Sequence, residues 1–208
     1  TAARQLAAPN TRLITWGHKL SFAYATAAAT DGDLAALARH ICLTRQLLCS
    51  SCQGIFLDTE DMAAVEVLGE RFFALLREEN RRHPPADLSL RAKAALHLRT
   101  EELEAHESGR RIFRGDGVSV TVAPDSRLEL SWLGGNCWVK PLPRRKLLAA
   151  LKGQKGYLQT AGLLCAPEER QELSALLARA GLVRITEAGE MSRTLSGEAH
   201  DGDYPLRA

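Results

Sequence analysis

The segment from residue 157 to residue 185 constrains the fold more than any other part of the chain, because it reads as a strand, a helix and a second strand. The first strand is the apolar run 157–165, and Pro167 at a first helical position, with two glutamates after it, marks the start of the helix. Gly181 lies just beyond the helix end, and the apolar run 182–185 follows it. Two strands joined by a helix cross over right-handed onto a parallel sheet, so this unit predicts an α/β fold.

The rest of the chain alternates elements of the same kinds. Apolar runs and period-two patterns predict strands at residues 12–15, 20–25, 54–57, 112–113, 118–122, 128–132 and 138–141. Apolar stripes with capping residues predict helices at 33–48, 59–82, 87–107 and 144–152. Asp33 is expected to cap the first of these helices, and Asp116-Gly117 to turn a hairpin. We therefore expect an α/β domain whose mostly parallel sheet is flanked by helices.

Composition limits the classes of protein to which the chain can belong. Its 208 residues suit one large or two small domains, and 45% hydrophobic residues are enough for a globular core. The formal net charge of +2 gives no reason to invoke nucleic acid, and the basic run 144–146 reads as the solvated start of a helix. No apolar run is long enough to span a membrane, and no secretory signal pattern is present. An odd count of five cysteines without a regular framework indicates reduced thiols, so a cytoplasmic protein is expected.

The segment 46–58, Gln-Leu-Leu-Cys-Ser-Ser-Cys-Gln-Gly-Ile-Phe-Leu-Asp, is where we look for chemistry. It joins a helix end to a strand, and it places the thiols of Cys49 and Cys52 and the hydroxyls of Ser50 and Ser51 on the turn between them. A loop that regular elements fix at both ends is a common way to present a nucleophile. Free cysteine is also among the most buried residue types, so a structural role for either thiol stays open.

The pair Cys49 and Cys52 also allows a redox or a zinc interpretation. Zinc lacks ligands, because the chain has no second Cys-x-x-Cys pair and no histidine pair at ligand spacing, so no metal is expected. A redox pair lacks support from its position, because thioredoxin-like motifs open a helix whereas this pair precedes a strand.

Resemblance to a known family favours catalysis. The run 37–57 contains Gln-Leu-Leu-Cys-Ser-Ser-Cys-Gln at residues 46–53, and it resembles the catalytic segment of the aldehyde dehydrogenase superfamily. In particular it resembles the acyl-CoA reductases of the bacterial luminescence type, whose motif reads roughly Gln-x-x-Cys-Ser-Ser-Pro-Gln before a strand. The resemblance makes Cys49 the nucleophile and places Cys52 where the family usually has proline.

A second segment carries the same resemblance. Thr15-Trp-Gly-His18-Lys19, followed by the strand-like run 20–24, is similar to the superfamily's Glu-Leu-Gly-Gly-Lys segment. The separation from Thr15 to Cys49 is 34 residues (49 − 15 = 34), which matches the superfamily's spacing between its glutamate and its cysteine. Thr15 thus stands where the usual general base would be, and a threonine hydroxyl is no carboxylate base at neutral pH. This favours an enzyme that uses acyl thioesters over one that hydrolyses its acyl-enzyme to an acid.

The source of thiolate activation is open at this level. The helix before Cys49 ends close to it, so the helix dipole disfavours a thiolate there. Three sources stay possible: the backbone amides of Ser50 and Ser51, a basic residue such as Lys19 or His18, or the bound cofactor. These residues, with the threonine at the base position, are our candidates for the vicinity of the oxyanion and the substrate.

The resemblance implies NADPH as the cofactor and places its binding mainly in a domain that this chain lacks. No Gly-x-Gly-x-x-Gly loop follows a predicted strand, and residues 1–208 would correspond to the cysteine-bearing catalytic domain. Within them, Glu129 is the candidate for contact with the nicotinamide ribose, and His200 is a candidate for the lining of the acyl or nicotinamide cleft. A surface turn formed by His-Asp-Gly is the alternative for His200.

The function implied by the resemblance is reduction of a long-chain acyl thioester to an aldehyde through an acyl-Cys49 intermediate. The thioester would be an acyl-CoA or an acyl-carrier thioester, and a homo-oligomer or a complex is expected for the full-length protein. Two alternatives stay open. One is a CoA-acylating aldehyde dehydrogenase, which runs the same chemistry toward the thioester. The other is a non-catalytic or thiol-exchange domain that uses Cys49 and Cys52 as a redox pair.

Overall fold

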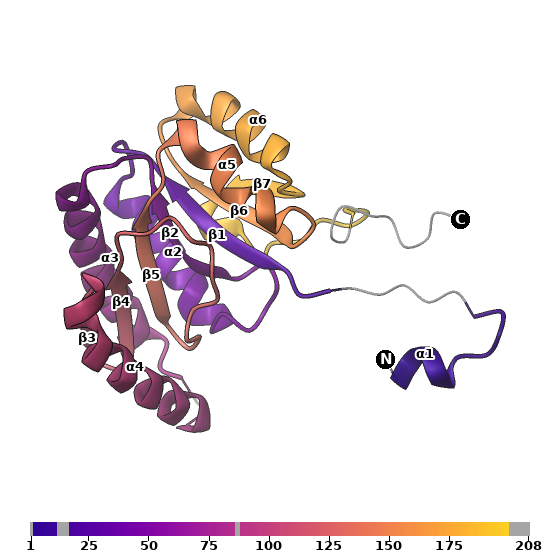
Figure 1. Ribbon diagram of the computed structural model, residues 1–208, viewed down its shortest axis with the longest axis horizontal. Coiled ribbons are helices and arrows are strands. Elements are labelled where there is room, and N and C mark those ends of the chain that lie inside the picture. Colours follow the sequence, from indigo (N-terminus) through magenta and orange to yellow (C-terminus); the bar gives the residue numbers. More distant parts are fainter. Residues whose placement is uncertain (1, 12–16, 86–87, 200–208) are drawn as a thin grey trace.

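A seven-stranded sheet forms the centre of the molecule, with the strand order β3-β4-β5-β2-β1-β6-β7 (Figure 1). The computed structural model describes residues 2–11, 17–85 and 88–199. Every neighbouring pair in this sheet is parallel except β3 and β4, which form an antiparallel hairpin. The strands are β1 (Leu20–Ala25), β2 (Cys52–Leu57), β3 (Arg111–Gly115), β4 (Val118–Val122), β5 (Asn136–Pro141), β6 (Leu158–Leu164) and β7 (Arg184–Glu187).

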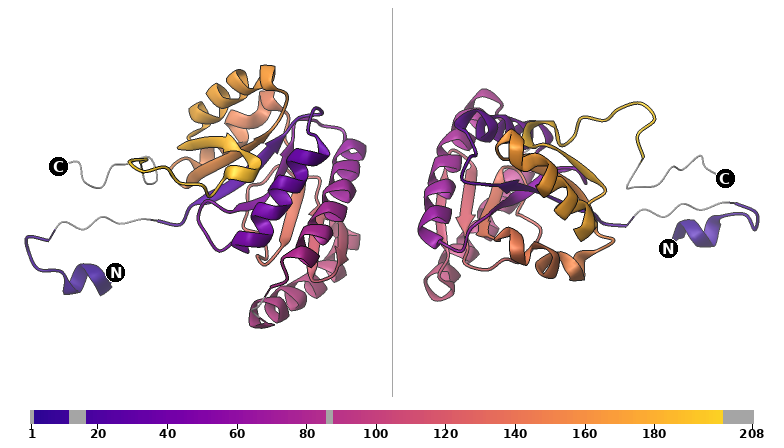
Figure 2. Two further views of the ribbon diagram at one scale, coloured as in Figure 1. Left: turned by 180° about the vertical axis from the view of Figure 1, so that it is seen from behind. Right: turned by 90° about the horizontal axis from the view of Figure 1, so that it is seen from above.

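Helices cover both faces of the sheet (Figure 2). The helices are α1 (Ala2–Leu6), α2 (Asp31–Thr44), α3 (Met62–Arg82), α4 (Leu88–Ser108), α5 (Leu147–Leu151) and α6 (Arg170–Ala180). The short 3-10 turns are η1 (Arg144–Lys146), η2 (Lys152–Gln154), η3 (Pro167–Glu169) and η4 (Ala188–Glu190). α2 and α3 lie on one face and α5 and α6 on the other, while α1 lies apart from the sheet (Figure 1). The α/β fold with a mostly parallel sheet flanked by helices is therefore confirmed, and β6, α6 and β7 form the predicted strand, helix and strand unit.

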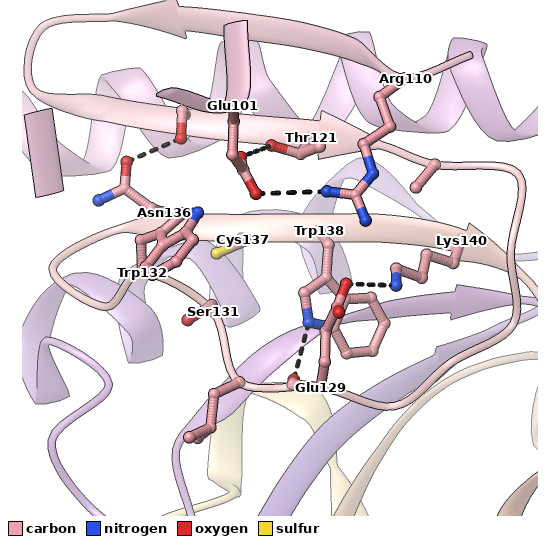
Figure 3. Close-up of a pocket in the computed structure, with 13 residues that line it drawn as sticks. Glu101, Arg110, Thr121, Glu129, Ser131, Trp132, Asn136, Cys137, Trp138 and Lys140 are labelled. Carbon is pink, nitrogen blue, oxygen red and sulfur yellow. Dashed lines mark hydrogen bonds and ion pairs between the residues drawn. The ribbon is translucent and has the colours of Figure 1, made fainter. Parts of the chain in front are cut away.

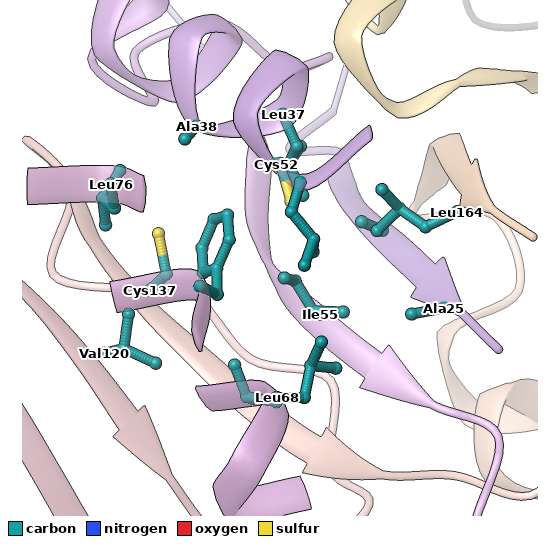
Figure 4. Packing of buried hydrophobic residues seen from close by; sticks show 14 of the residues in the cluster. Ala25, Leu37, Ala38, Cys52, Ile55, Leu68, Leu76, Val120, Cys137 and Leu164 are labelled. Atoms are coloured by element: carbon teal, nitrogen blue, oxygen red, sulfur yellow. The ribbon is translucent and has the colours of Figure 1, made fainter. Parts of the chain in front are cut away.

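Two apolar cores separate the sheet from its helices. The first lies between the sheet and the helices α2 and α3, and it contains Leu37, Ile55 and Leu68 (Figure 4). The second lies against α5 and α6 and contains Phe56 and Leu173. Successive residues of a strand point to opposite faces, so the neighbours Ile55 and Phe56 enter different cores. This explains why the central strands are buried along almost their whole length.

The helix before the cysteine segment differs from the prediction at both ends. Thr30, rather than Asp33, is its N-cap: Asp33 N donates to Thr30 Oγ1 at 3.2 Å, and Thr30 N donates to Asp33 Oδ2 at 3.2 Å. The helix ends at Thr44 because Arg45 takes a left-handed conformation with a φ of 52°. Leu48, which the predicted helical stripe included, therefore lies outside the helix and is 50% exposed.

Residues 128–132 do not form the strand that their alternating pattern predicted. Of the three alternating apolar residues, Leu128 is buried, whereas Leu130 and Trp132 are 68% and 40% exposed. The hydrogen bonds of this backbone go to side chains: Trp138 Nε1 donates to Glu129 O at 3.1 Å, and Ser131 N donates to Gln53 Oε1 at 3.1 Å. We call this irregular segment the arm (residues 128–132), because it lies against β5 without joining the sheet.

Candidate active site

Cys49 lies in the turn between α2 and β2, at the edge of the sheet where the parallel strands begin. Ser51 N donates to Leu48 O at 2.9 Å, and Leu48 N donates to Ser51 Oγ at 3.2 Å, which closes a four-residue turn around Cys49 and Ser50. A turn of this kind uses the carbonyl of its first residue and the amide of its last, so it does not consume the Cys49 amide. Cys49 itself is exposed.

Two neighbouring strands hold Cys49 from the side of the sheet. Ser21 of β1 is buried; it donates its hydroxyl to Cys49 O at 2.7 Å and accepts the Thr160 amide at 3.1 Å. Gln159 of β6 donates Nε2 to Cys49 Sγ at 3.2 Å. Different residues therefore hold the backbone and the thiol of Cys49.

Both strands that flank β1 carry an extra residue at this edge. In β6, residues 159–160 stand opposite Ser21 alone. In β2, residues 53–54 stand opposite Phe22 alone. Such β-bulges bend a strand, re-aim its side chains and are common beside active sites. Here each bulge contains a glutamine that binds the cysteine turn.

Gln46, the first glutamine of the motif, is a buried bridge and is only 2% exposed. Its Nε2 donates to Cys52 O at 3.0 Å and to Asn136 O at 3.1 Å, and its Oε1 accepts Gly135 N at 2.9 Å. The backbone of Gln46 is left-handed, with a φ of 61°, two residues after the helix ends at Thr44. These contacts join the cysteine turn to the start of β5.

Gln53, the second glutamine of the motif, forms a similar bridge. Its Nε2 donates to Ser51 O at 3.3 Å, and its Oε1 accepts Ser131 N at 3.1 Å and Ser131 Oγ at 2.9 Å. The next residue, Gly54, has no room for a side chain, because a Cβ at that position would lie 2.1 Å from Trp138 Cδ2. The motif thus attaches the cysteine turn to the arm and allows β2 to approach β5 closely.

Ser50 and Ser51 have different places in the turn. Ser50 Oγ lies 2.8 Å from Ser192 Oγ, which ties the turn to the segment after η4. Ser51 is buried, and both its amide and its hydroxyl are bound to the backbone of Leu48. The amide of Ser51, one of the predicted sources of thiolate stabilisation, is therefore already in use.

Lys19 and His18, the predicted basic residues, directly precede β1 at the same edge of the sheet. Lys19 Nζ donates to Gly156 O at 2.8 Å, and His18 is exposed. The hydrogen bond to the thiol that the described residues show comes instead from Gln159, which sequence reasoning missed. The available signal was a glutamine near the start of a mostly apolar, buried strand.

Cys52 lies in the core beneath α2 and α3 rather than beside Cys49 at the surface (Figure 4). It is fully buried, its Sγ donates to Gly54 O at 3.2 Å, and burial raises the pKa of its thiol to about 12. Both cysteines are free thiols. A buried thiol that resists ionisation is a poor partner for thiol exchange, so the structure weighs against the redox and zinc interpretations.

Glu129 lies in the lining of a surface pocket of about 180 Å³ (Figure 3). Its Oε1 lies 2.5 Å from Nζ of Lys140, whose side chain is 1% exposed, and Asp125 Oδ1 accepts from the same amine at 2.8 Å. A buried ammonium needs such partners, because an unpaired charge in an apolar environment is costly. The carboxylate of Glu129 thus neutralises Lys140, and contact with a nicotinamide ribose stays a prediction.

At the opposite edge of the sheet, where the strands end, three helix starts do not fit the phosphates of a dinucleotide. Such a site uses the free amides of a helix N-terminus. These three helix starts carry carboxylates: Asp31 and Asp33 in α2, Asp61 before α3, and Glu168 and Glu169 in η3. These groups cap the amides or repel an anion, so these three helix starts offer no pyrophosphate site.

Two predicted site residues, Thr15 and His200, lie outside the described residues, so their places in the site stay predictions. Within the described ranges, no group of three or more His, Cys, Asp or Glu side chains could hold a metal ion. None of the helices in the same ranges is long and apolar enough to cross a membrane.

The fold of the chain is that of solved aldehyde dehydrogenases. The Δ-pyrroline-5-carboxylate dehydrogenase from Mycobacterium tuberculosis shares it with a TM-score of 0.61 and 16% identity, over 88% of this chain and 37% of that one. PnpE from Pseudomonas sp. WBC-3 gives a TM-score of 0.62 at 14% identity, over 90% of this chain and 42% of that one. The putative aldehyde dehydrogenase PutA from Anabaena variabilis gives 0.55 at 16% identity, over 88% and 42%. The chain thus spans less than half the length of each of these proteins.

The chain belongs to the LuxC family of acyl-CoA reductases, whose model matches residues 1–208. A comparison with curated protein sequences finds no match. The resemblance drawn from the cysteine segment is therefore confirmed at the level of the family.

Proposed function

We propose that the protein is an oxidoreductase that converts an acyl thioester to an aldehyde, with Cys49 as the nucleophile of an acyl-enzyme intermediate. The observation that carries the proposal is the contrast among the five cysteines. Cys49 is exposed on a turn that side chains hold in place, whereas Cys42, Cys52 and Cys137 are buried and Cys165 is half-buried. Membership of an acyl-CoA reductase family supports a thioester as the substrate.

This geometry supports acyl transfer to Cys49. The Cys49 sulfur attacks the thioester carbonyl, a carbon–sulfur bond forms, and the carbonyl oxygen takes the negative charge. The backbone amide of Cys49 donates to that oxygen, and one such donor is worth about 3 kcal/mol. The bond to CoA then breaks, and the CoA thiolate takes up a proton equivalent to the one that the Cys49 thiol released to solvent.

Apolar side chains beside Cys49 suit a substrate with a hydrocarbon chain. Leu47 and Leu48 immediately precede it and are 63% and 50% exposed. Large apolar side chains grouped at a surface often mark a contact site. We assign to these two leucines contact with the acyl chain of a long-chain thioester.

NADPH, when bound, would supply the hydride that takes the acyl group to the aldehyde level. The three helix starts described above offer no site for its phosphates, so we assign its binding mainly to a domain outside these residues, and Glu129 stays the candidate for contact with the nicotinamide ribose. A nicotinamide cofactor is supported by the Δ-pyrroline-5-carboxylate dehydrogenase from Mycobacterium tuberculosis, which has been solved with NAD bound. The same chemistry in the opposite direction would acylate CoA, and family membership favours reduction.

We place the protein in the cytoplasm. All five cysteines are free thiols, and a reducing compartment keeps thiols in that state. A reduced Cys49 is also what the acyl transfer requires.

The test is intact mass spectrometry of the chain after incubation with a long-chain acyl-CoA, followed by peptide mapping. We expect an acyl adduct that hydroxylamine removes and that maps to Cys49. Cys49→Ala should abolish the adduct, while Cys165→Ala, at the half-buried thiol, is the matched control and should retain it. Cys52→Ala should also retain it. An adduct that maps to another cysteine, or that persists in Cys49→Ala, would contradict the proposal.

A further inference from the structure

We propose that Gln159 is an active-site residue that positions the Cys49 sulfur and stabilises its thiolate form. The proposal deepens the acyl-transfer function proposed above and rests on it. Its starting point is the hydrogen bond of 3.2 Å from Gln159 Nε2 to Cys49 Sγ. The two residues are far apart in the sequence, so only the sheet brings them together.

The backbone around Gln159 is built to present this side chain. Gln159 is 8% exposed, although the cysteine that it binds is exposed. It lies in the bulge of β6, where residues 159–160 face Ser21 alone, and a bulge changes the direction of side chains that a regular strand would send to alternate faces. Leu158 and Ala161, on either side of the bulge, are packed in the core beneath α5 and α6. The packed backbone of β6 therefore holds the side-chain amide of Gln159 in position beside Cys49.

The chemistry of the pair favours the charged form of the sulfur. A thiol sulfur is a weak acceptor, whereas a thiolate accepts a charge-assisted hydrogen bond from an amide N–H. A donor that binds the charged form of a group favours that form. Gln159 has no proton to lose near neutral pH, so the donor is present across the whole working range.

Charged side chains at this edge of the sheet have other partners. Lys19 binds Gly156 O, Arg45 binds Asn80 and His83, Arg184 binds Glu198, and Arg193 binds Glu190. His18 and Lys155 are exposed, and water and salt screen their charge. The neutral amide of Gln159 is therefore the contact that acts on the sulfur in the described structure.

The test is the pH dependence of Cys49 alkylation by iodoacetamide in the full 208-residue chain, read by peptide mapping. Gln159→Met keeps the length of the side chain and removes the donor. We expect the midpoint of the pH–rate profile to rise by about one unit, and the rate at pH 7 to fall about tenfold. Gln159→Glu is nearly isosteric and places a negative charge beside the sulfur, so we expect a larger rise.

Gln171→Met, at an exposed position of α6, is the matched control and should leave the profile unchanged. Circular dichroism, and continued protection of the buried Cys42 and Cys137 from alkylation, identify the variants that fold. If Gln159→Met does not fold, the nearly isosteric Gln159→Glu provides the test. An unchanged midpoint in a folded Gln159 variant overturns the proposal. Alkylation needs neither thioester nor cofactor, so a shifted profile without an acyl adduct would count against the substrate and not against Gln159.

Discussion

The cysteine turn at one edge of the parallel sheet and the helix starts at the other are held by different kinds of interaction. At the edge where the strands begin, neutral amides and hydroxyls hold the cysteine turn, through Gln46, Gln53 and Ser21. At the edge where the strands end, ion pairs centre on Arg144, which binds Asp58 at 2.6 Å and Glu169 at 2.8 Å. We call these the neutral edge and the ionic edge.

The difference follows from what each edge has to do. A nucleophilic sulfur alternates between neutral and charged forms, and a carboxylate beside it would oppose the charged form. Neutral donors and acceptors fix its position without that penalty. At the ionic edge no such constraint applies, so a single guanidinium can join the end of β2 to the start of α6. The comparison teaches that the proposed nucleophile is placed by geometry rather than by a nearby ion.

The ionic edge also corrects an expectation from the sequence. The basic run 144–146 was predicted to be a solvated helix start, but the side chain of Arg144 is only 32% exposed and binds three carboxylates. Arg145 and Lys146 match the prediction better, because they are more exposed and both bind Glu60. Adjacent residues of one charge run therefore have different environments, which depend on the strands beside them.

The largest effect is expected from breaking the neutral edge at Gln46. Gln46→Leu would leave Cys52 O, Asn136 O and Gly135 N buried without their partner, and we expect it to lower the free energy of unfolding by about 3 kcal/mol. Urea unfolding measures this loss. Gln171→Leu, exposed in α6, is the control and should change stability by less than about 0.5 kcal/mol. A loss for Gln46→Leu no greater than the control's would show that the bridge is dispensable.

A smaller effect is expected from breaking the ionic edge. Arg144→Met keeps the apolar stem but leaves Asp58 and Glu169 without their cation, and we expect a loss of about 2 kcal/mol at pH 7. Arg145→Met, in the same 3-10 turn but with an exposed partner, is the matched control and should lose much less. Urea unfolding of both variants beside the wild type gives the comparison. Equal losses would mean that the half-buried network is worth no more than a surface pair.

The pH dependence of that loss sharpens the comparison. Hydrogen bonds from Thr26 and Arg144 lower the pKa of Glu169. A group with a lowered pKa stabilises the fold above its unfolded pKa, about 4.3 for glutamate, and the contribution disappears as the pH falls through the folded value. The difference in free energy of unfolding between wild type and Arg144→Met should therefore become smaller in acid. The corresponding difference for Gln46→Leu should not. A difference for Arg144→Met that is constant from pH 7 to pH 3 would contradict the ionic description.

The smallest effect is expected at Ser21, and it separates position from stability. Ser21→Ala removes the hydroxyl between Cys49 O and Thr160 N, and we expect a loss of about 1 kcal/mol together with slower acylation of Cys49. Urea unfolding and the rate of acyl-adduct formation measure the two parts. Ser174→Ala in α6 is the control for a serine away from the turn. An unchanged acylation rate in Ser21→Ala would show that the hydrogen bond to the backbone carbonyl of Cys49 does not contribute to the reactivity of its thiol.

The sequence pattern predicted an element correctly where interactions within a short stretch of residues determine that element. The helix predicted at residues 59–82 is observed at Met62–Arg82, and the hairpin predicted at Asp116-Gly117 is confirmed, because both depend on capping and turn chemistry within a few residues. The arm was misread, because its backbone bonds to side chains from β2 and β5, and of its alternating apolar residues Leu128 is buried while Leu130 and Trp132 are exposed. No pattern inside residues 128–132 distinguishes these two cases.

The sequence by itself determined the fold class, the family and the segment that bears Cys49, because periodicity, capping residues and a contiguous motif are all local properties of the chain. Only the tertiary structure decided which residues surround the sulfur. Gln159 lies 110 residues from Cys49 along the chain and meets it because β1 pairs with both β2 and β6 and because a bulge turns the amide toward the loop. Strand order and register are set by the packing of the whole sheet, so a contact that depends on them cannot be read from either segment alone.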